Sequence, residues 1–265
     1  MIHPTALVDA SVDISDDCVI GAFGVIERGV QLGRRVRIGE HAVIKSGTVL
    51  GDDVDVHSGV VLGDEPQIVG QGFDFESGVI IGDRTVLREG VTVHRASQPH
   101  QQTRVGEDCL LMAYSHVAHD AVVGNHCILA NLALVAGCVT IEDYVFLSGG
   151  SMVHQFVHVG ESAFVSGNAE ITMHIPPFVT ALGRNNVSNL NLIGLQRRGF
   201  SSEELSDIKQ QYRAVYGSDS RSFPKKALAA LEEGKFKTER GRQFLEFFTH
   251  QTHDRGFAYP KKRGE

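Results

Sequence analysis

Two histidines and a carboxylate stand close together in the segment Ser115-His116-Val117-Ala118-His119-Asp120. An imidazole titrates near neutral pH, and a neighbouring carboxylate orients the ring and stabilises its charged form. His119 and Asp120 are therefore candidates for a general base and its partner. The chain contains 13 histidines, so the pair gains meaning only from the elements that position it.

Those elements follow a repeat of six residues. An aliphatic side chain recurs at every sixth position, and a small or β-branched one follows four residues later. The longest unbroken series is Val105, Leu111, Val117, Val123, Leu129, Val135, Ile141, Leu147, Val153, Val159, Val165 and Ile171. A period of six fits neither an amphipathic helix nor a hairpin strand. It predicts a parallel β-helix, in which one hexad forms one side and three hexads close a triangular coil.

The repeat gives His119 neighbours in space. Eighteen residues make one coil, so residues 18 apart lie one above another at about the 4.8 Å spacing of adjacent strands. His119, Gly137 and Gln155 share one hexad position and form a single file. His154 and Cys138 lie beside that file. The spacing thus predicts a base, a backbone amide and polar side chains on one face.

Two segments interrupt the hexads, at residues 64–78 and 98–104. Insertions in a solenoid become loops on one face, often at the binding site. The second loop leaves from the hexad that starts at Val93, which shares the face of His119. The spacing does not fix the face from which the first loop leaves.

After Ile175-Pro176-Pro177 the hexads stop and helical patterns begin. Ser201 and Glu204 form a capping box for a helix that ends at Gly217. Two more helices are predicted around Pro224–Glu233 and Thr238–His250. The predicted organisation is a β-helix over residues 1–183 and a C-terminal helical domain over 184–265, which caps the open end of the solenoid.

Charge divides the chain in the same way. The net charge is −7, yet residues 1–183 carry 9 basic and 22 acidic side chains, whereas residues 184–265 carry 16 and 10. A basic tail beside an acidic body predicts an acidic partner for the helical part, unless it is only a solvated helical surface.

Several classes of protein are disfavoured. No apolar run approaches the roughly 20 residues of a membrane span, and no export signal opens the chain, so we expect a cytoplasmic protein without an integral membrane segment. The four cysteines lack CxxC spacing, which argues against a disulfide framework or a zinc knuckle. We expect no metal, no cofactor and no nucleic-acid partner.

Six segments together resemble one enzyme family over nearly the full length. They are Ile2-His3-Pro4-Thr5-Ala6, Thr92-Val93-His94-Arg95, Ser115 to Asp120, Val153-His154-Gln155-Phe156, Ile175-Pro176-Pro177 and Gly194 to Phe200. The chain resembles the acyl-ACP–UDP-N-acetylglucosamine O-acyltransferase family of lipid A biosynthesis (the LpxA family), within the hexapeptide acyltransferases. The resemblance implies a left-handed coil, a homotrimer with sites between subunits, and acyl carrier protein and a UDP-sugar as partners.

The resemblance also assigns roles residue by residue. His119 matches the general base, Asp120 the acid that orients it, and the Gly137 amide the oxyanion donor. Gly167 matches the position that limits acyl length, and glycine implies room for a longer chain. The implied substrate contacts are Gln67, His116, His154, Gln155, Asn191, Arg197 and Arg198.

Departures from the family leave the substrate open. Cys138 stands where the family has histidine, and Ile68 and Gly70 stand where aspartate and lysine hold the sugar. A 3-amino analogue of the UDP-sugar is therefore an alternative substrate. Alternatives of another class are a zinc carbonic anhydrase on the same fold, which would use histidines such as His94, or a non-catalytic solenoid. Acetyl-CoA-dependent relatives and the later N-acyltransferase of the pathway are disfavoured.

Overall fold

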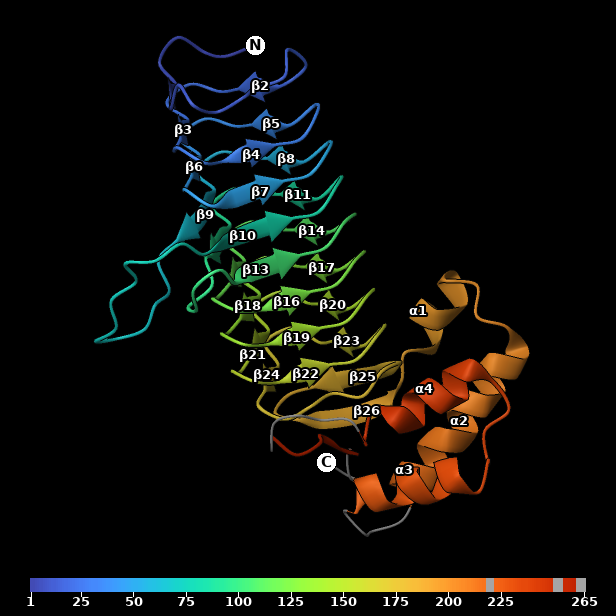
Figure 1. The fold of residues 1–265 in the computed structure, drawn as a ribbon. Helices are drawn as coiled ribbons and strands as arrows, with labels where there is room; N and C mark the ends of the chain where they lie inside the picture. Colours follow the sequence, from blue (N-terminus) through green and yellow to red (C-terminus); the bar gives the residue numbers. More distant parts are fainter. Residues whose placement is uncertain (218–221, 250–254, 261–265) are drawn as a thin grey trace.

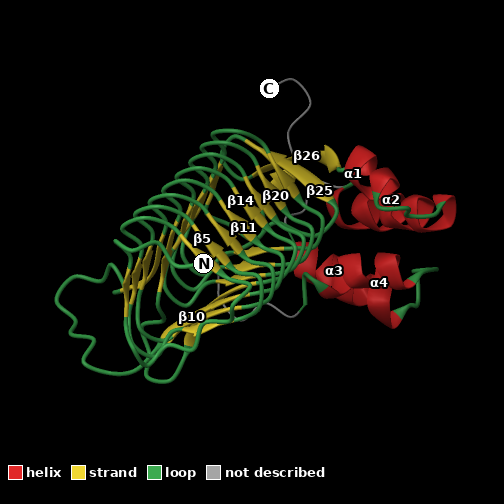
Figure 2. Cartoon of the chain, turned by 90° about the horizontal axis from the view of Figure 1, so that it is seen from above, coloured by secondary structure: helices red, strands yellow, loops and turns green. Residues whose placement is uncertain are grey.

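Short strands and sharp corners build a tall stack of triangular coils, with helices beside its C-terminal end (Figures 1 and 2). The computed structural model describes residues 1–217, 222–249 and 255–260. Strands one coil apart pair in parallel, for example His116 with Leu134 and Leu134 with Met152. The parallel β-helix predicted from the hexads is confirmed, and so is the left hand that the family resemblance implies.

The described strands form three sheets, one for each side of the coil. The nine-stranded sheet contains β1 (Leu7–Val8), β3 (Val25–Ile26), β6 (Val43–Ile44), β9 (Val61–Asp64), β12 (Thr92–His94), β15 (His116–Val117), β18 (Leu134–Val135), β21 (Met152–Val153) and β24 (Glu170–Ile171). The seven-stranded sheet contains β4 (Gln31–Leu32), β7 (Thr48–Leu50), β10 (Gly78–Ile81), β13 (Gln102–Val105), β16 (Val122–Val123), β19 (Thr140–Ile141) and β22 (His158–Val159). The eleven-stranded sheet contains β2 (Val19–Ile20), β5 (Arg37–Ile38), β8 (Asp55–Val56), β11 (Val86–Leu87), β14 (Leu110–Leu111), β17 (Ile128–Leu129), β20 (Phe146–Leu147), β23 (Phe164–Val165), β25 (Val179–Leu182), β26 (Asn186–Leu190) and β27 (Tyr259–Pro260).

The chain visits these sheets in a fixed order, which defines three corners. The first corner leads from the nine-stranded to the seven-stranded sheet, the second from the seven-stranded to the eleven-stranded sheet, and the third back to the nine-stranded sheet. At many corners the fourth residue of the hexad adopts a positive φ, such as 60° at Asp120 and 59° at Cys138. This left-handed conformation costs a non-glycine residue about 1 kcal/mol or more, which the packed coils must offset.

The interior is a continuous column of aliphatic side chains. Ile38, Leu62, Val93, Val117 and Val135 are each no more than 2% exposed. Burying one such side chain stabilises the fold by about 1.5–3 kcal/mol. Cys18, Cys109 and Cys127 fill small inward positions, as the hexad pattern predicts.

Both loops leave the solenoid at the first corner. The first joins β9 to β10 and the second joins β12 to β13. The long loop projects from the side of the stack in Figure 1. The face of the first loop, which the spacing left open, is therefore the face of the second loop and of His119.

An antiparallel pair, β25 with β26, ends the solenoid at residues 179–190 and straddles the predicted domain boundary at residue 183. The division into two domains stays a prediction. The helices that follow are α1 (Leu192–Arg197), α2 (Ser202–Tyr216), α3 (Phe223–Glu232) and α4 (Glu239–Glu246). The capping box of Ser201 and Glu204 is confirmed. Helix α4 ends before the predicted terminus at His250, which lies outside the described residues.

A buried carboxylate organises the helices. Asp207 of α2 is 1% exposed and accepts hydrogen bonds from the backbone N–H groups of Lys237 and Thr238, at 2.8 and 2.7 Å. These bonds fix the start of α4. Burial alone would raise the pKa of Asp207, but the hydrogen bond from the Gln211 side chain, together with those from Lys237 and Thr238, holds it below its usual range. Among the described residues, no helix is both long and apolar enough to cross a membrane.

Candidate active site

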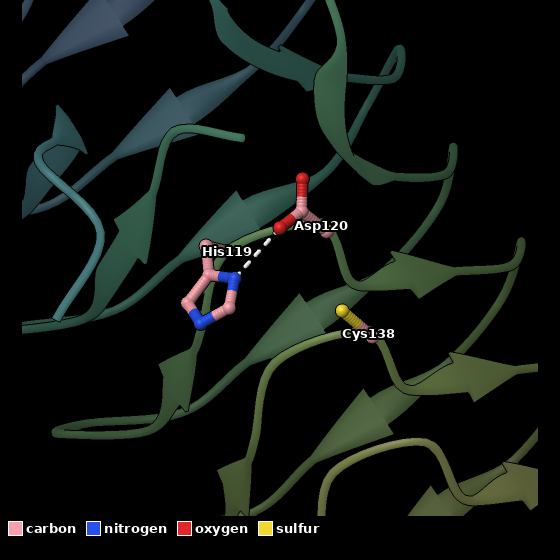
Figure 3. A group of neighbouring side chains, drawn as sticks. All are labelled: His119, Asp120 and Cys138. Carbon is pink, nitrogen blue, oxygen red and sulfur yellow. Dashed lines mark hydrogen bonds and ion pairs between the residues drawn. The ribbon is translucent and has the colours of Figure 1, made fainter. Parts of the chain in front are cut away.

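His119 and Asp120 lie at the first corner, directly after β15. The Nδ1 atom of His119 is 2.7 Å from Oδ2 of Asp120, and the His119 side chain is 8% exposed (Figure 3). An ionised carboxylate only accepts hydrogen bonds, so Nδ1 carries the proton and donates it to Asp120. The Nε2 atom is then the acceptor, which is the state that a general base requires.

Asp120 is held by residues on either side of the second loop. Its carboxylate accepts hydrogen bonds from Ser97 N at 2.9 Å and from Ser97 Oγ at 2.6 Å. Its own backbone N–H donates to Oγ1 of Thr103 at 2.8 Å. These three bonds fix the carboxylate and, through it, the imidazole ring. The sequence prediction missed Ser97 and Thr103. The signal that could have found them is their place at the two ends of the interruption on the His119 face, Ser97 directly before it and Thr103 near its end.

Gly137 lies against the His119 ring, as the 18-residue spacing predicts. A β-carbon at this position would lie 2.5 Å from Cε1 and 2.6 Å from Nε2 of His119, so only glycine fits. The next residue, Cys138, donates its N–H to the His119 carbonyl at 3.0 Å. In the part of the chain that the structure describes, no hydrogen-bond acceptor is paired with the Gly137 N–H.

A cavity of about 460 Å³ opens beside His119 on the outer face of the nine-stranded sheet. Its lining joins predicted site residues to apolar side chains of successive coils. The lining residues are Gln67, His116, Ala118, His119, Leu134, Val135, Ala136, Gly137, Met152, Val153, His154, Gln155, Glu170, Ile171 and Thr172. The cavity therefore brings together the base, the glycine amide and four of the seven predicted substrate contacts.

His116 faces this cavity as a neutral ring. Its Nδ1 atom lies 2.7 Å from Oγ1 of Thr92, and its ring packs edge-on against His94. Burial, and after it the electrostatic influence of the neighbouring His94 and His119 rings, lowers the pKa of His116 to about 4. The ring therefore offers the cavity a hydrogen-bonding group and no charge.

The first loop reaches this cavity because β12 anchors it. His94 Nδ1 lies 2.6 Å from the Glu65 carbonyl, and the Arg95 guanidinium donates to the carbonyls of Phe73 and Phe75 at 2.7 Å each. The same guanidinium lies over both phenylalanine rings. Arg95, whose side chain is 12% exposed, is a third residue that the sequence prediction missed.

The remaining predicted contacts lie at other corners of the same chain. Asn191 caps α1 and donates to the Ser162 carbonyl at the second corner. Arg198 is paired there with Glu161 at 2.8 Å, and its guanidinium lies 3.5 Å above the Tyr144 ring. Arg197 is exposed on α1. Their roles toward a substrate stay predictions.

Gly167 lies at the third corner, across the nine-stranded sheet from His119. A β-carbon there would meet the Gly149 carbonyl at 3.3 Å, so a larger residue would require a small local shift. Within one chain the structure does not bring Gly167 together with His119. Its predicted role in acyl length remains untested.

A larger cavity, of about 1080 Å³, lies under the first loop nearer the N-terminus. It is lined by mixed charges, among them Glu27, Lys45 and Arg95. None of the predicted site residues faces it, so we place the candidate site in the smaller cavity, where the base lies.

Within one chain, the described histidines do not gather into a three-histidine zinc site of the carbonic anhydrase kind. Among the described residues, the group that could hold a metal ion is His119, Asp120 and Cys138, and it includes none of His94, His116 and His154. The three-histidine arrangement that this alternative needs is therefore not assembled within the described part of one chain.

Comparison with known proteins agrees with this geometry. Residues 175–258 match the family model described as Udp N-acetylglucosamine O-acyltransferase, domain 2. Residues 102–137 match the bacterial transferase hexapeptide model, and residues 11–39 and 32–64 match the hexapeptide repeat of succinyl-transferase.

Relatives match over most of their length. The acyl-[acyl-carrier-protein]–UDP-N-acetylglucosamine O-acyltransferase of Chlorobaculum parvum is 45% identical over 98% of both chains, and that of Saccharophagus degradans is 40% identical over 81% of this chain and 84% of the relative. The UDP-N-acetylglucosamine acyltransferase structure from Campylobacter jejuni is 31% identical, with a TM-score of 0.89 over 98% of this chain and 100% of that one. The predicted resemblance is confirmed: this chain belongs to the acyl-[acyl-carrier-protein]–UDP-N-acetylglucosamine O-acyltransferase family.

Proposed function

We propose that this protein transfers a 3-hydroxyacyl chain from acyl carrier protein to the 3-hydroxyl of UDP-N-acetylglucosamine, the first step of lipid A biosynthesis. The observation that carries this proposal is the His119–Asp120 pair stacked on Gly137 at the mouth of the apolar cavity. One group accepts a proton and its neighbour offers a free N–H, which are the two functions that acyl transfer to an alcohol requires.

The transfer proceeds directly between the two substrates. Nε2 of His119 takes the proton of the sugar hydroxyl while the sugar oxygen attacks the thioester carbonyl. The Gly137 N–H stabilises the oxyanion of the tetrahedral intermediate. When the intermediate collapses, the C–S bond breaks and the carrier thiolate takes the proton from His119. General base catalysis of this kind contributes about 10²–10⁴ in rate.

The cavity wall supplies the substrate contacts. The apolar side chains of Leu134 and Met152 suit an acyl chain, and the polar groups of His116, His154 and Gln67 suit the sugar nucleotide. Ile68 and Gly70 stand where the family holds the sugar with charged side chains. The charged contacts that would select UDP-N-acetylglucosamine are therefore absent at these two positions. Their absence supports the 3-amino sugar as the second candidate substrate.

The distribution of the predicted contacts supports a homotrimer. His119, Gly167 and Asn191 lie at the first, third and second corners, and the body of the coil separates them within one chain. Three copies packed side by side would bring corners of adjacent chains together and complete three sites. The shared site makes the trimer part of the catalytic proposal.

The helical region is the proposed docking surface for the carrier protein, which we place in the cytoplasm with the enzyme. Exposed cations on and beside the helices give this surface its charge: Lys209, Arg213, Lys225 and Lys237. Complementary charge raises the rate of encounter with an acidic carrier and weakens with salt.

A panel of substrates tests the proposal. Purified protein is offered acyl carrier protein thioesters of several lengths with UDP-N-acetylglucosamine or its 3-amino analogue, and the products are identified by mass. We expect an ester at the 3-position. An amide formed only with the amino sugar would replace the first candidate by the second. No product with either sugar, from folded trimers, would contradict the proposed function.

A further inference from the structure

Cys138 differs from the other cysteines of the chain. Cys18, Cys109 and Cys127 are buried in the solenoid, whereas Cys138 is half-buried at the first corner beside the catalytic pair. Its corner position follows from a φ of 59°, which turns the chain directly after Gly137. The thiol therefore lies partly exposed beside the His119–Asp120 pair.

The three side chains offer a mixed set of metal ligands. An imidazole nitrogen of His119, a carboxylate oxygen of Asp120 and Sγ of Cys138 all lie within 4.8 Å of one another. Figure 3 draws the thiol on the side of the ring that carries Nδ1. Zinc binds N, O and S ligands at about 2.0–2.3 Å, so side-chain rotations that draw these atoms together by about an ångström suffice to enclose an ion.

We propose that His119, Asp120 and Cys138 form a binding site for a thiophilic divalent cation, such as Zn²⁺ or Cd²⁺, and that the bound cation blocks acyl transfer. The thiolate selects soft and borderline metals over Mg²⁺ and Ca²⁺. Ser97, which holds the Asp120 carboxylate by two hydrogen bonds, fixes one ligand in advance. Solvent or a substrate oxygen supplies the fourth ligand from the open cavity.

Inhibition follows from the position of the ring proton of His119. A cation on Nδ1 replaces the hydrogen atom that His119 donates to Asp120, and the single proton of the neutral ring then resides on Nε2. The base has lost its acceptor atom. The thiol of Cys138 releases its own proton to solvent.

Spectroscopy of the untagged protein with Co²⁺ tests the site without any assay of activity. We expect one equivalent of Co²⁺ per chain with a thiolate-to-metal charge-transfer band in the near ultraviolet. Cys138→Ser should abolish the band and weaken binding by about 10–100-fold or more, since even an outer-shell partner of a metal is worth that much. Cys127→Ala, which places at this inward position the residue that Ala133 and Ala163 provide in other coils, should keep the band.

The opposite spectra would overturn the proposal: no thiolate band in the wild type, or a band that survives Cys138→Ser. Weak binding of the same strength in the wild type and in Cys138→Ser would likewise assign the ion to another part of the surface.

The inhibitory effect rests on the proposed function and has its own experiment. Initial rates of transfer are measured against Zn²⁺ concentration for the wild type and Cys138→Ser, each relative to its own rate without zinc. The free thiol of the carrier protein also binds zinc. Its concentration is kept equal in the two reactions, so it does not affect the comparison between the two enzymes. We expect the wild type to be inhibited at a zinc concentration about tenfold or more below that of the variant, with recovery after chelation. Equal sensitivity would refute blockage at this site. A wild type that binds Co²⁺ but transfers no acyl group would refute the proposed function alone.

Discussion

Two corners of the coil share one backbone geometry but differ in how their side chains meet those of the next coil. At the second corner, charged and aromatic side chains pair with those one coil away: Arg35 with Asp53 at 2.6 Å, and His126 stacked on Tyr144 at 4.5 Å. At the first corner, His119 stacks on Gly137, which has no side chain to engage it. His126 and Asp120 share the fourth hexad position, with φ of 55° and 60°.

The difference shows that the hexad position of a residue fixes where its side chain lies. The residue one coil away then determines whether that side chain is paired or left available for a ligand. A file of mutually paired groups stabilises the solenoid. A file interrupted by glycine leaves the Nε2 atom of a histidine open to a cavity. Under the proposed function, catalysis therefore depends on the absence of a side chain at Gly137 as much as on His119 itself.

The largest expected effect separates the two corner histidines. His119→Ala should lower kcat/KM by about 10²–10⁴, because the general base is lost. His126→Ala, at the second corner, should leave kcat/KM within a few-fold, because it removes a stacking contact and no reacting group. Steady-state rates, with thermal unfolding to verify the fold, check both. Similar losses in the two variants would contradict the comparison.

Gly137→Ala should cost about 10²-fold in kcat, since the new methyl group displaces the imidazole by roughly an ångström. Gly149→Ala is the matched control at the third corner, where a β-carbon meets the Asn131 carbonyl at 3.4 Å, an ordinary contact. Activity unaffected by Gly137→Ala would mean that His119 does not need this close approach.

Arg95→Ala should raise KM for the UDP-sugar about tenfold with a smaller change in kcat, because the loop that carries Gln67 loses two charge-assisted hydrogen bonds. Arg95→Lys should restore little, since one ammonium group cannot reproduce the planar fork between two carbonyls. Arg88→Ala, an exposed arginine paired with Glu89, is the control. Full rescue by lysine would show that only the charge matters.

Acid stability should depend on His116. Its pKa is about 4 in the folded chain against 6.5 for the free side chain, so the unfolded chain binds more protons between these values. The stabilisation is complete above pH 6.5 and is lost as the pH falls toward 4. Urea midpoints at pH 7 and pH 4.5 should therefore differ more for the wild type than for His116→Gln. Equal differences would remove His116 from the acid response.

The smallest effect belongs to the second corner. Arg35→Ala should lower the free energy of unfolding by about 0.2–1 kcal/mol, because its bidentate pair with Asp53 is exposed to solvent. The loss should shrink in high salt, and the transfer rate should not change. A loss of several kcal/mol would mean that the corner pairs form a cooperative network.

The periodicity of the sequence predicted which residues share a face of the coil. It did not predict the individual side-chain contacts that hold the loops and the helices. A period of six fixes the phase of every residue, so the file of His119, Gly137 and Gln155 was accessible without coordinates. Ser97 and Arg95 were not, because their partners lie across loops whose course follows no repeat. For the same reason the pairing of Arg198 with Glu161 appears only in the structure.

The 18-residue turn also governs which insertions this gene can tolerate. A duplicated coil within the N-terminal turns, before the first loop, would lengthen the solenoid and leave every later corner in register. Six extra residues between His119 and Gly137 would instead carry the glycine round to the second corner, although each hexad would still pack. Such a chain would fold and have no active site. Insertions of whole 18-residue coils before the first loop are therefore the ones that selection for activity would accept.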